Sequence, residues 1–228
     1  MSPKTGTGVG FGRTPDPEDR MSRPVLRGFP QSSYMMTARA VAALKGVDVD
    51  FQPIAPGENR RPEWLALNPF GKVPVLQHGD LTLYETSAIS RYLDEAFDGP
   101  ALVPDNAHDR ARMEQWVSVV NCYFYPRGVG GFILKVIFAG PEGPDMAAIA
   151  ANQPALDEAL DILDAGVGEG TFLVGDTPTL ADLFVAPILM GIGRMPGGRQ
   201  MLDKRPGLGR MVGALVQTPG FMSAFQGA

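Results

Sequence analysis

The chain has 228 residues, of which 44% are hydrophobic, and carries a formal net charge of −5. This length allows one large hydrophobic core or two modest ones, and we start from two domains. The acidic balance and the lack of long Lys/Arg runs argue against a nucleic-acid or anionic-membrane partner, because both need clustered positive charge. No apolar run reaches the roughly 18–20 residues that a membrane-spanning helix needs.

Cysteine usage indicates a reducing compartment, and we expect a cytoplasmic protein. Cys122 is the only cysteine, so no internal disulfide can form, and we interpret it as a small buried apolar side chain. No His/Cys cluster has metal-ligand spacing, so we expect no metal.

Residues 1–20 are rich in Gly, Pro and charge and lack the apolar segment of a secretory signal. We predict a disordered leader that takes no part in the fold. Whether it is native, precedes an internal start at Met21 or was added to the chain stays open.

Residues 21–98 predict a domain with the order β-α-β-α-β-β-α. Hydrophobic periodicity, Gly and Pro stops and one hairpin signal place its elements. The strands are expected at 25–29, 49–54, 73–77 and 81–84, and the helices at 33–44, 62–67 and 86–97.

Residues 99–105 have the Gly and Pro content of a linker, and strand signals vanish after them. Met113, Trp116, Val117 and Val120 recur at helical spacing in the following segment. We therefore predict an all-helical second domain over residues 106–228.

Three local motifs resemble glutathione transferases. Residues 68–76, N-P-F-G-K-V-P-V-L, are similar to the family's N-P-x-G-x-V-P-x-L segment, in which the Val-Pro bond is cis. Residues 85–89, E-T-S-A-I, are similar to E/Q-S-x-A-I, and residues 175–182, G-D-T-P-T-L-A-D, to G-x-x-x-S/T-x-A-D. In the last motif, Thr179 and Asp182 have the spacing of a capping box, which would stabilise a helix and take no part in the chemistry.

The resemblance implies a thioredoxin-like glutathione-binding domain followed by an all-helical domain. It also implies glutathione as co-substrate, a hydrophobic electrophile as second substrate, and a homodimer. Val73, before Pro74, would pair its backbone with the cysteine unit of glutathione. Thr86 and the helix N-terminus would bind the γ-glutamyl carboxylate, while Glu85 accepts the ammonium group.

The thiol of glutathione must react as the thiolate, although a free thiol has a pKa of about 8.5. Family members stabilise the anion with Tyr, Ser or Cys. The tyrosine position holds Arg27, Gly28 or Phe29 here, and the lone cysteine lies in the second domain. Resemblance to serine-type, phi-like members assigns the role to Ser32; the alternatives are Ser33, a backbone amide or Tyr34.

For the glycyl carboxylate, residues 57–63, G-E-N-R-R-P-E, resemble the phi-like pattern G-E-H-K-x-P-E. Asn59 replaces the usual His and Arg60 the usual Lys. Arg60 and Lys72 are the expected carboxylate partners, with Asn59 beside them; the alternative is solvated surface charge.

The electrophile pocket is expected between the domains. Its candidates are apolar and aromatic residues near both helical segments: Met35, Met36, Tyr123, Phe124 and Tyr125. The alternative is that they are core residues. The motifs also leave open an isomerase, dehalogenase or peroxidase that uses the same glutathione site, and a non-enzymatic ligand-binding or assembly module.

Overall fold

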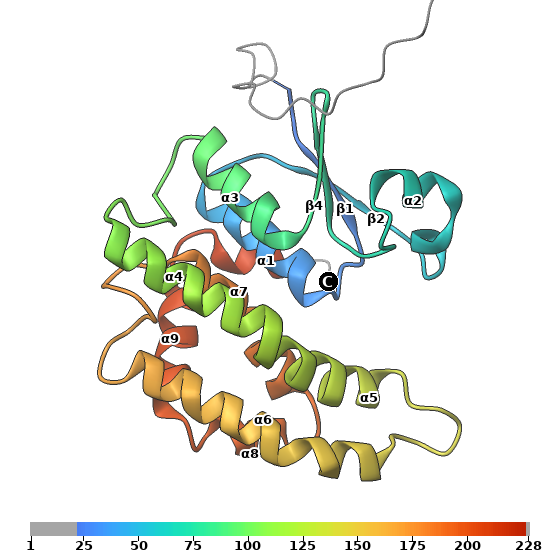
Figure 1. Ribbon diagram of the computed structural model, residues 1–228, viewed down its shortest axis with the longest axis vertical. Helices are drawn as coiled ribbons and strands as arrows, with labels where there is room; N and C mark the ends of the chain where they lie inside the picture. The colour runs from blue at the N-terminus through green and yellow to red at the C-terminus, as the bar shows by residue number, and fades with distance from the viewer. Residues whose placement is uncertain (1–21, 227–228) are drawn as a thin grey trace, which may run out of the picture.

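The computed structural model describes residues 22–226 as a sheet-containing domain stacked on a bundle of helices (Figure 1). The predicted leader, residues 1–20, lies outside the described residues. The order of an α/β domain followed by an all-helical domain agrees with the sequence prediction.

Four short strands form the sheet of the first domain: β1 Val25–Gly28, β2 Asp50–Pro53, β3 Val75–His78 and β4 Leu81–Tyr84. They lie in the order β2-β1-β3-β4. β1 runs parallel to β2 and antiparallel to β3, with Leu26 opposite both Phe51 and Leu76. A parallel pair needs a crossover connection, and α1 Ser33–Leu44 supplies it.

Helix α3, Thr86–Ala96, packs beside α1, and the short helix α2, Pro62–Leu67, follows the 3-10 turn η2, Glu58–Arg60. The shared core is made of fully buried side chains from the sheet and both long helices: Leu26, Leu76, Ala38, Val41, Ile89 and Leu93. The predicted positions of these helices agree with the structure to within one residue.

The second domain is helical apart from an isolated bridge between Gly140 and Gly143. Its elements follow in chain order: α4 Ala107–Val119, η3 Val120–Phe124, η4 Pro126–Ile133, α5 Leu134–Ile137, α6 Met146–Val167, α7 Leu180–Arg194, α8 Gly198–Leu202, α9 Pro206–Gln217 and η5 Phe221–Phe225. η3 and η4 are π-helical, which the sequence did not predict, and η5 is a 3-10 turn.

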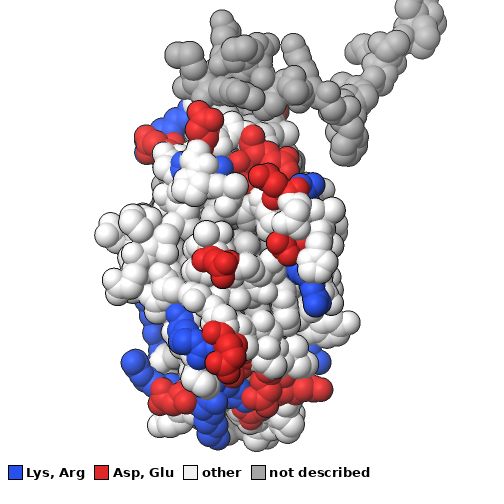
Figure 2. Space-filling view, turned by 90° about the vertical axis from the view of Figure 1, so that its left-hand side faces the viewer, with Lys and Arg blue, Asp and Glu red and all other residues white. Residues whose placement is uncertain are grey.

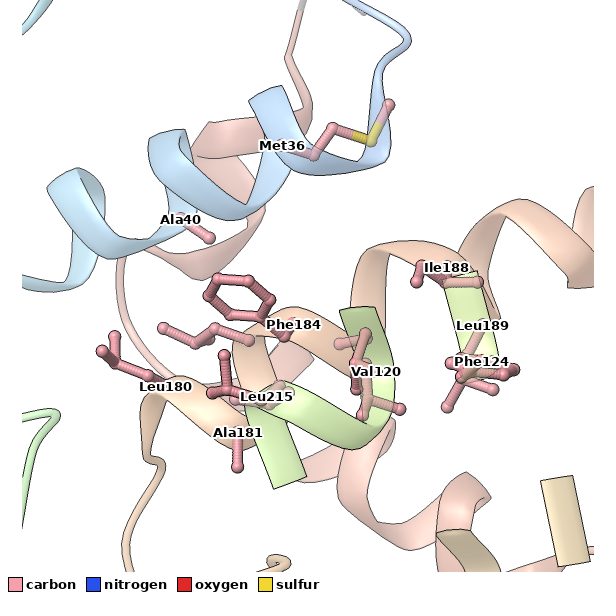
Figure 3. Packing of buried hydrophobic residues seen from close by; sticks show 14 of the residues in the cluster. Met36, Ala40, Val120, Phe124, Leu180, Ala181, Phe184, Ile188, Leu189 and Leu215 are labelled. Atoms are coloured by element: carbon pink, nitrogen blue, oxygen red, sulfur yellow. The ribbon is translucent and has the colours of Figure 1, made fainter. Parts of the chain in front are cut away.

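Helix α7 forms the centre of the second domain and also packs against α1. Figure 3 shows Phe184 of α7 next to Ala40 of α1. The buried hydroxyl of Thr37 donates a hydrogen bond to the carbonyl of Leu183 at 3.0 Å. The two domains therefore share one continuous core.

The segment between the domains, residues 97–106, has no helix or strand but is held at its middle. The N–H of Leu102 donates to Asp94 at 2.9 Å, and its carbonyl accepts from the N–H of Leu180 at 3.0 Å. Asp94 also forms a buried ion pair with Lys45 at 3.2 Å. These contacts fix the connection to both domains.

The predicted capping box is confirmed at the N-terminus of α7. The N–H and the hydroxyl of Thr179 both donate to the carboxylate of Asp182, at 2.8 and 2.9 Å. No helix within residues 22–226 is long and apolar enough to cross a membrane. On the face shown in Figure 2, basic and acidic side chains are intermixed.

Candidate active site

Ser32 is the N-cap of α1, directly after the loop that follows β1. Its Oγ accepts a hydrogen bond from the N–H of Met35 at 3.4 Å, and its own N–H donates to the carbonyl of Phe29 at 3.0 Å. A serine hydroxyl accepts and donates at the same time. Among the described residues nothing accepts the hydroxyl hydrogen, so it remains free for a ligand at the positive end of the helix.

Tyr34, one of the alternatives to Ser32, is committed elsewhere. Its hydroxyl donates to Oδ1 of Asn121 at 2.8 Å, and its ring stacks on Tyr125 with centroids 4.2 Å apart. Burial, with smaller contributions from Tyr125 and Glu85, raises the pKa of Tyr34 far above its ordinary value. The structure therefore disfavours Tyr34 as the thiol partner, whereas Ser33 and a backbone amide stay open.

The loop before β3 offers backbone groups to a ligand. The Val73–Pro74 bond is cis, as the resemblance implied. Nothing in residues 22–226 pairs with the N–H or the carbonyl of Val73, because β3 starts only at Val75. The preceding carbonyl, that of Lys72, accepts bonds from Trp64 Nε1 and Asn68 Nδ2 at 3.2 and 3.0 Å. The loop is thus pinned while Val73 stays open for strand-like pairing.

Glu85 has a backbone conformation that few residues adopt. Its φ is 69°, and it is the one non-glycine residue with positive φ within the described range. Such a conformation costs on the order of 1 kcal/mol and often occurs at functional sites. The exposed side chain of Glu85 stands at the N-cap of α3, beside the buried Thr86 and the unpaired amides of the first turn.

The predicted glycyl-carboxylate residues differ from one another in their surroundings. Asn59 Nδ2 donates to the carbonyl of Gly71 at 2.7 Å, so Asn59 holds the loop that carries Lys72. Gly71 has φ of +61°, and a Cβ there would lie 2.8 Å from the carbonyl oxygen of Asn59. Arg60 and Lys72 are exposed and form no ion pair with a described carboxylate, whereas Arg61 lies 3.8 Å from Glu58.

The amino-acid sequence of this chain matches the sequences of known proteins. Residues 26–101 match the glutathione S-transferase N-terminal domain, and residues 146–210 match the C-terminal domain of the same family. Glutathione S-transferase F10 of Arabidopsis thaliana is 35% identical over 68% of this chain and 75% of its own length. The chain belongs to the glutathione S-transferase family. Glutathione is its co-substrate, and it is an enzyme of the transferase class.

Solved structures agree with this glutathione S-transferase assignment. Glutathione transferase F7 from Populus trichocarpa superposes with a TM-score of 0.80 at 28% identity, covering 88% of this chain and 97% of its own. A theta class enzyme from Xanthomonas axonopodis pv. citri, solved with glutathione bound, gives 0.81 at 26% identity, covering 91% and 99%. The predicted fold class, a thioredoxin-like domain with an all-helical domain, is confirmed.

The candidates for the transferase's second-substrate pocket fall into two groups. Met35 is fully buried, and a Cβ on Gly28 would come within 2.5 Å of its methyl group and 2.9 Å of Val73 Cβ. Met35 therefore packs against Gly28 and has no exposed surface for a second substrate. Tyr123 is 56% exposed with the guanidinium of Arg127 over its ring, and Tyr125 is half-buried on Tyr34. Both tyrosines remain candidates.

Two features of the transferase differ from the sequence analysis or were missed by it. Cys122 is exposed, so its interpretation as a buried side chain is wrong. Asn121 is not among the residues that the sequence predicts for the site, yet it contacts both Tyr34 and Ser87 from the helical domain. Asn121 is separated in sequence by 87 positions from Tyr34 and by 34 positions from Ser87, so no local sequence pattern indicates these contacts. Within the described part of the chain, no group of His, Cys, Asp and Glu is arranged to hold a metal ion.

Proposed function

We propose that the protein transfers glutathione to a hydrophobic electrophile and that Ser32 stabilises the reacting thiolate. The observation that carries this role is the free hydroxyl hydrogen of Ser32 at the N-terminus of α1. A donor and a helix N-terminus both favour an anion. The thiolate then attacks the electrophilic carbon: a C–S bond forms, the leaving group departs, and the thiol proton goes to solvent.

The rest of glutathione is recognised by the groups that the protein leaves unpaired. Val73 pairs with the cysteine unit through its backbone, next to Pro74. Thr86 and the first turn of α3 receive the γ-glutamyl carboxylate, and Glu85 accepts the ammonium group. Arg60 and Lys72 attract the glycyl carboxylate, with Asn59 fixing the loop between them. Neither Arg60 nor Lys72 forms an ion pair with a carboxylate of the described residues, which supports this division.

The electrophile binds beside Tyr123 and Tyr125, whose rings lie on the helical domain. A homodimer rests on the family resemblance, and light scattering of the purified protein tests it. A cytoplasmic location rests on the single free cysteine; a fluorescent fusion tests it.

The test compares wild type with Ser32→Ala and Ser32→Thr. The assays are retention on immobilised glutathione, conjugation to a chloronitrobenzene, and the pH dependence of kcat/KM. Lowering the thiol pKa by two units, from about 8.5 to about 6.5, raises the thiolate fraction at pH 7 from about 3% to about 76%, so Ser32→Ala should lose about 25-fold in rate. Ser32→Thr keeps a hydroxyl and should retain most of the activity.

Ser32 also caps α1, so the melting temperature is measured in parallel; loss of a cap costs about 1 kcal/mol. An unchanged thiol pKa in Ser32→Ala would contradict the assignment and point to Ser33 or an amide. Wild type that binds glutathione without conjugation would favour an isomerase, dehalogenase or peroxidase. Failure to bind glutathione would favour a non-enzymatic module.

A further inference from the structure

Asn121 of the helical domain contacts two separate helices of the glutathione-binding domain. Its Oδ1 accepts a hydrogen bond from the hydroxyl of Tyr34 in α1 at 2.8 Å. Its Nδ2 donates to the hydroxyl oxygen of Ser87 in α3 at 3.2 Å. One amide side chain thus joins α1, α3 and η3.

Two residues near the ends of the π-helical segment η3 contact the same side chain of the first domain. Asn121 and Tyr125 lie four residues apart near the ends of η3, and both contact Tyr34. The rings of Tyr34 and Tyr125 are nearly parallel, with an interplanar angle of 3°, and Phe184 of α7 meets Tyr34 edge-on at 6.1 Å. Tyr34 is therefore held by two helices of the second domain.

The two contacts of Asn121 lie next to the residues of the proposed site. Tyr34 follows Ser32 by two positions in the first turn of α1, and Ser87 directly follows Thr86 in the first turn of α3. We infer that Asn121 is a positioning residue that fixes the separation of these two helix N-termini. This inference rests on the proposed function, because only then do both ends touch one glutathione molecule.

A fixed separation has a clear physical purpose. The sulfur and the γ-glutamyl carboxylate belong to the same short molecule, so the hydroxyl of Ser32 and the first turn of α3 must be spaced to fit both. Misplacement by about 1 Å weakens such a paired recognition strongly. An asparagine suits this position because its amide donates and accepts without placing a charge beside a thiolate.

Several titratable side chains lie near the contact between Tyr34 and Asn121. Tyr34 interacts electrostatically with Tyr125, Glu85 and Cys122. Glu85 is the one carboxylate among these four residues. A second carboxylate at position 121 would add to its repulsion of an anionic ligand.

The test uses Asn121→Ala, with Asn152→Ala as a matched control. Asn152 is also a half-buried amide of the helical domain, but its Nδ2 donates to the carbonyl of Arg127 at 3.0 Å within that domain. We expect Asn121→Ala to raise the KM for glutathione about tenfold, as loss of two hydrogen bonds predicts, with a smaller change in kcat. Asn152→Ala should lower the melting temperature and leave this KM unchanged.

A double-mutant cycle with Tyr34→Phe checks the route of the effect. If Asn121 acts through Tyr34, its KM effect shrinks in the Tyr34→Phe background, because the shared bond is already lost. Asn121→Asp keeps acceptors for both hydroxyls but adds a charge, so it should raise the thiol pKa in the pH profile. Asn121→Ala should not. If Asn121→Ala does not fold, Tyr34→Phe and Ser87→Ala remove the same bonds from the other side.

An Asn121→Ala enzyme with lower stability but unchanged KM for glutathione would overturn the inference. Additive effects of Asn121→Ala and Tyr34→Phe on KM would also overturn it. The Ser32→Ala enzyme, assayed in parallel, separates this failure from failure of the proposed function. An unchanged thiol pKa in Ser32→Ala contradicts the role of Ser32, whatever Asn121→Ala does.

Discussion

Polar groups at the proposed glutathione site of the first domain differ from the buried polar networks of the second domain in how they are paired. At one edge of the first domain, the hydroxyl hydrogen of Ser32, the backbone of Val73 and the side chain of Glu85 have no partner in residues 22–226. In the second domain, Asp182 accepts three hydrogen bonds, and buried Arg205 pairs with two aspartates. Buried polar groups are normally paired, so the paired networks stabilise the fold. The unpaired groups of the first domain are partly or fully exposed and are therefore accessible to a ligand.

We expect the largest effect on the free energy of unfolding, when the carboxylate of Asp182 is removed. Asp182→Ala leaves the N–H groups of Leu173 and Thr179 and the hydroxyl of Thr179 without their acceptor. Because these groups are buried, the free energy of unfolding should fall by about 3 kcal/mol. Urea unfolding measures this loss, and Ser32→Ala should lose far less. An Asp182→Ala protein as stable as wild type would break the comparison.

The carboxylate of Asp182 also gives a prediction for pH. Burial raises its pKa to about 6, although three groups donate to it. The folded state therefore binds this proton more tightly than the unfolded chain, where the pKa is near 3.8. The stabilisation that comes from binding this proton is fully present below a pH of about 4 and is lost as the pH rises through 6. The free energy of unfolding should fall by at most about 3 kcal/mol over this range.

Asp182→Asn has no titrating group at this position and serves as the control. Its melting temperature should lack the fall between pH 4 and 6 that Asp182 contributes in wild type. If the melting temperatures of the two proteins changed with pH in the same way, Asp182 would not titrate between pH 4 and 6.

Two features of the first domain were expected from the resemblance of short motifs to glutathione transferases: the cis Val73–Pro74 bond and the helix that starts at Thr86. Each motif lies within nine residues, so the resemblance is visible in the sequence alone. The capping box at Thr179 was predictable for the same reason. The contacts of Asn121, the π-helical geometry of η3 and the exposure of Cys122 depend on packing between distant segments.

Two substitutions of Glu85 separate its backbone strain from its proposed role in binding glutathione. Glu85→Gly relieves the positive φ and should increase the free energy of unfolding by about 1 kcal/mol, because glycine adopts this conformation freely. It also removes the carboxylate, so the KM for glutathione should rise. Glu85→Gln keeps the strain and lacks the charge, so it should raise KM without gaining stability. A Glu85→Gly enzyme with unchanged KM would exclude the residue from the site.

The smallest effect concerns the exposed cations. Lys72→Ala and Arg60→Ala should each raise the KM for glutathione a few-fold, because exposed ion pairs contribute roughly 0.2–1 kcal/mol. Arg61→Ala is the control, since Arg61 already has Glu58 beside it and should leave KM unchanged. Raising the salt concentration should weaken glutathione binding in wild type and less so in Lys72→Ala. If Arg61→Ala raises KM as much as Lys72→Ala does, the loop attracts glutathione only through its general charge, and specific recognition of the glycyl carboxylate is wrong.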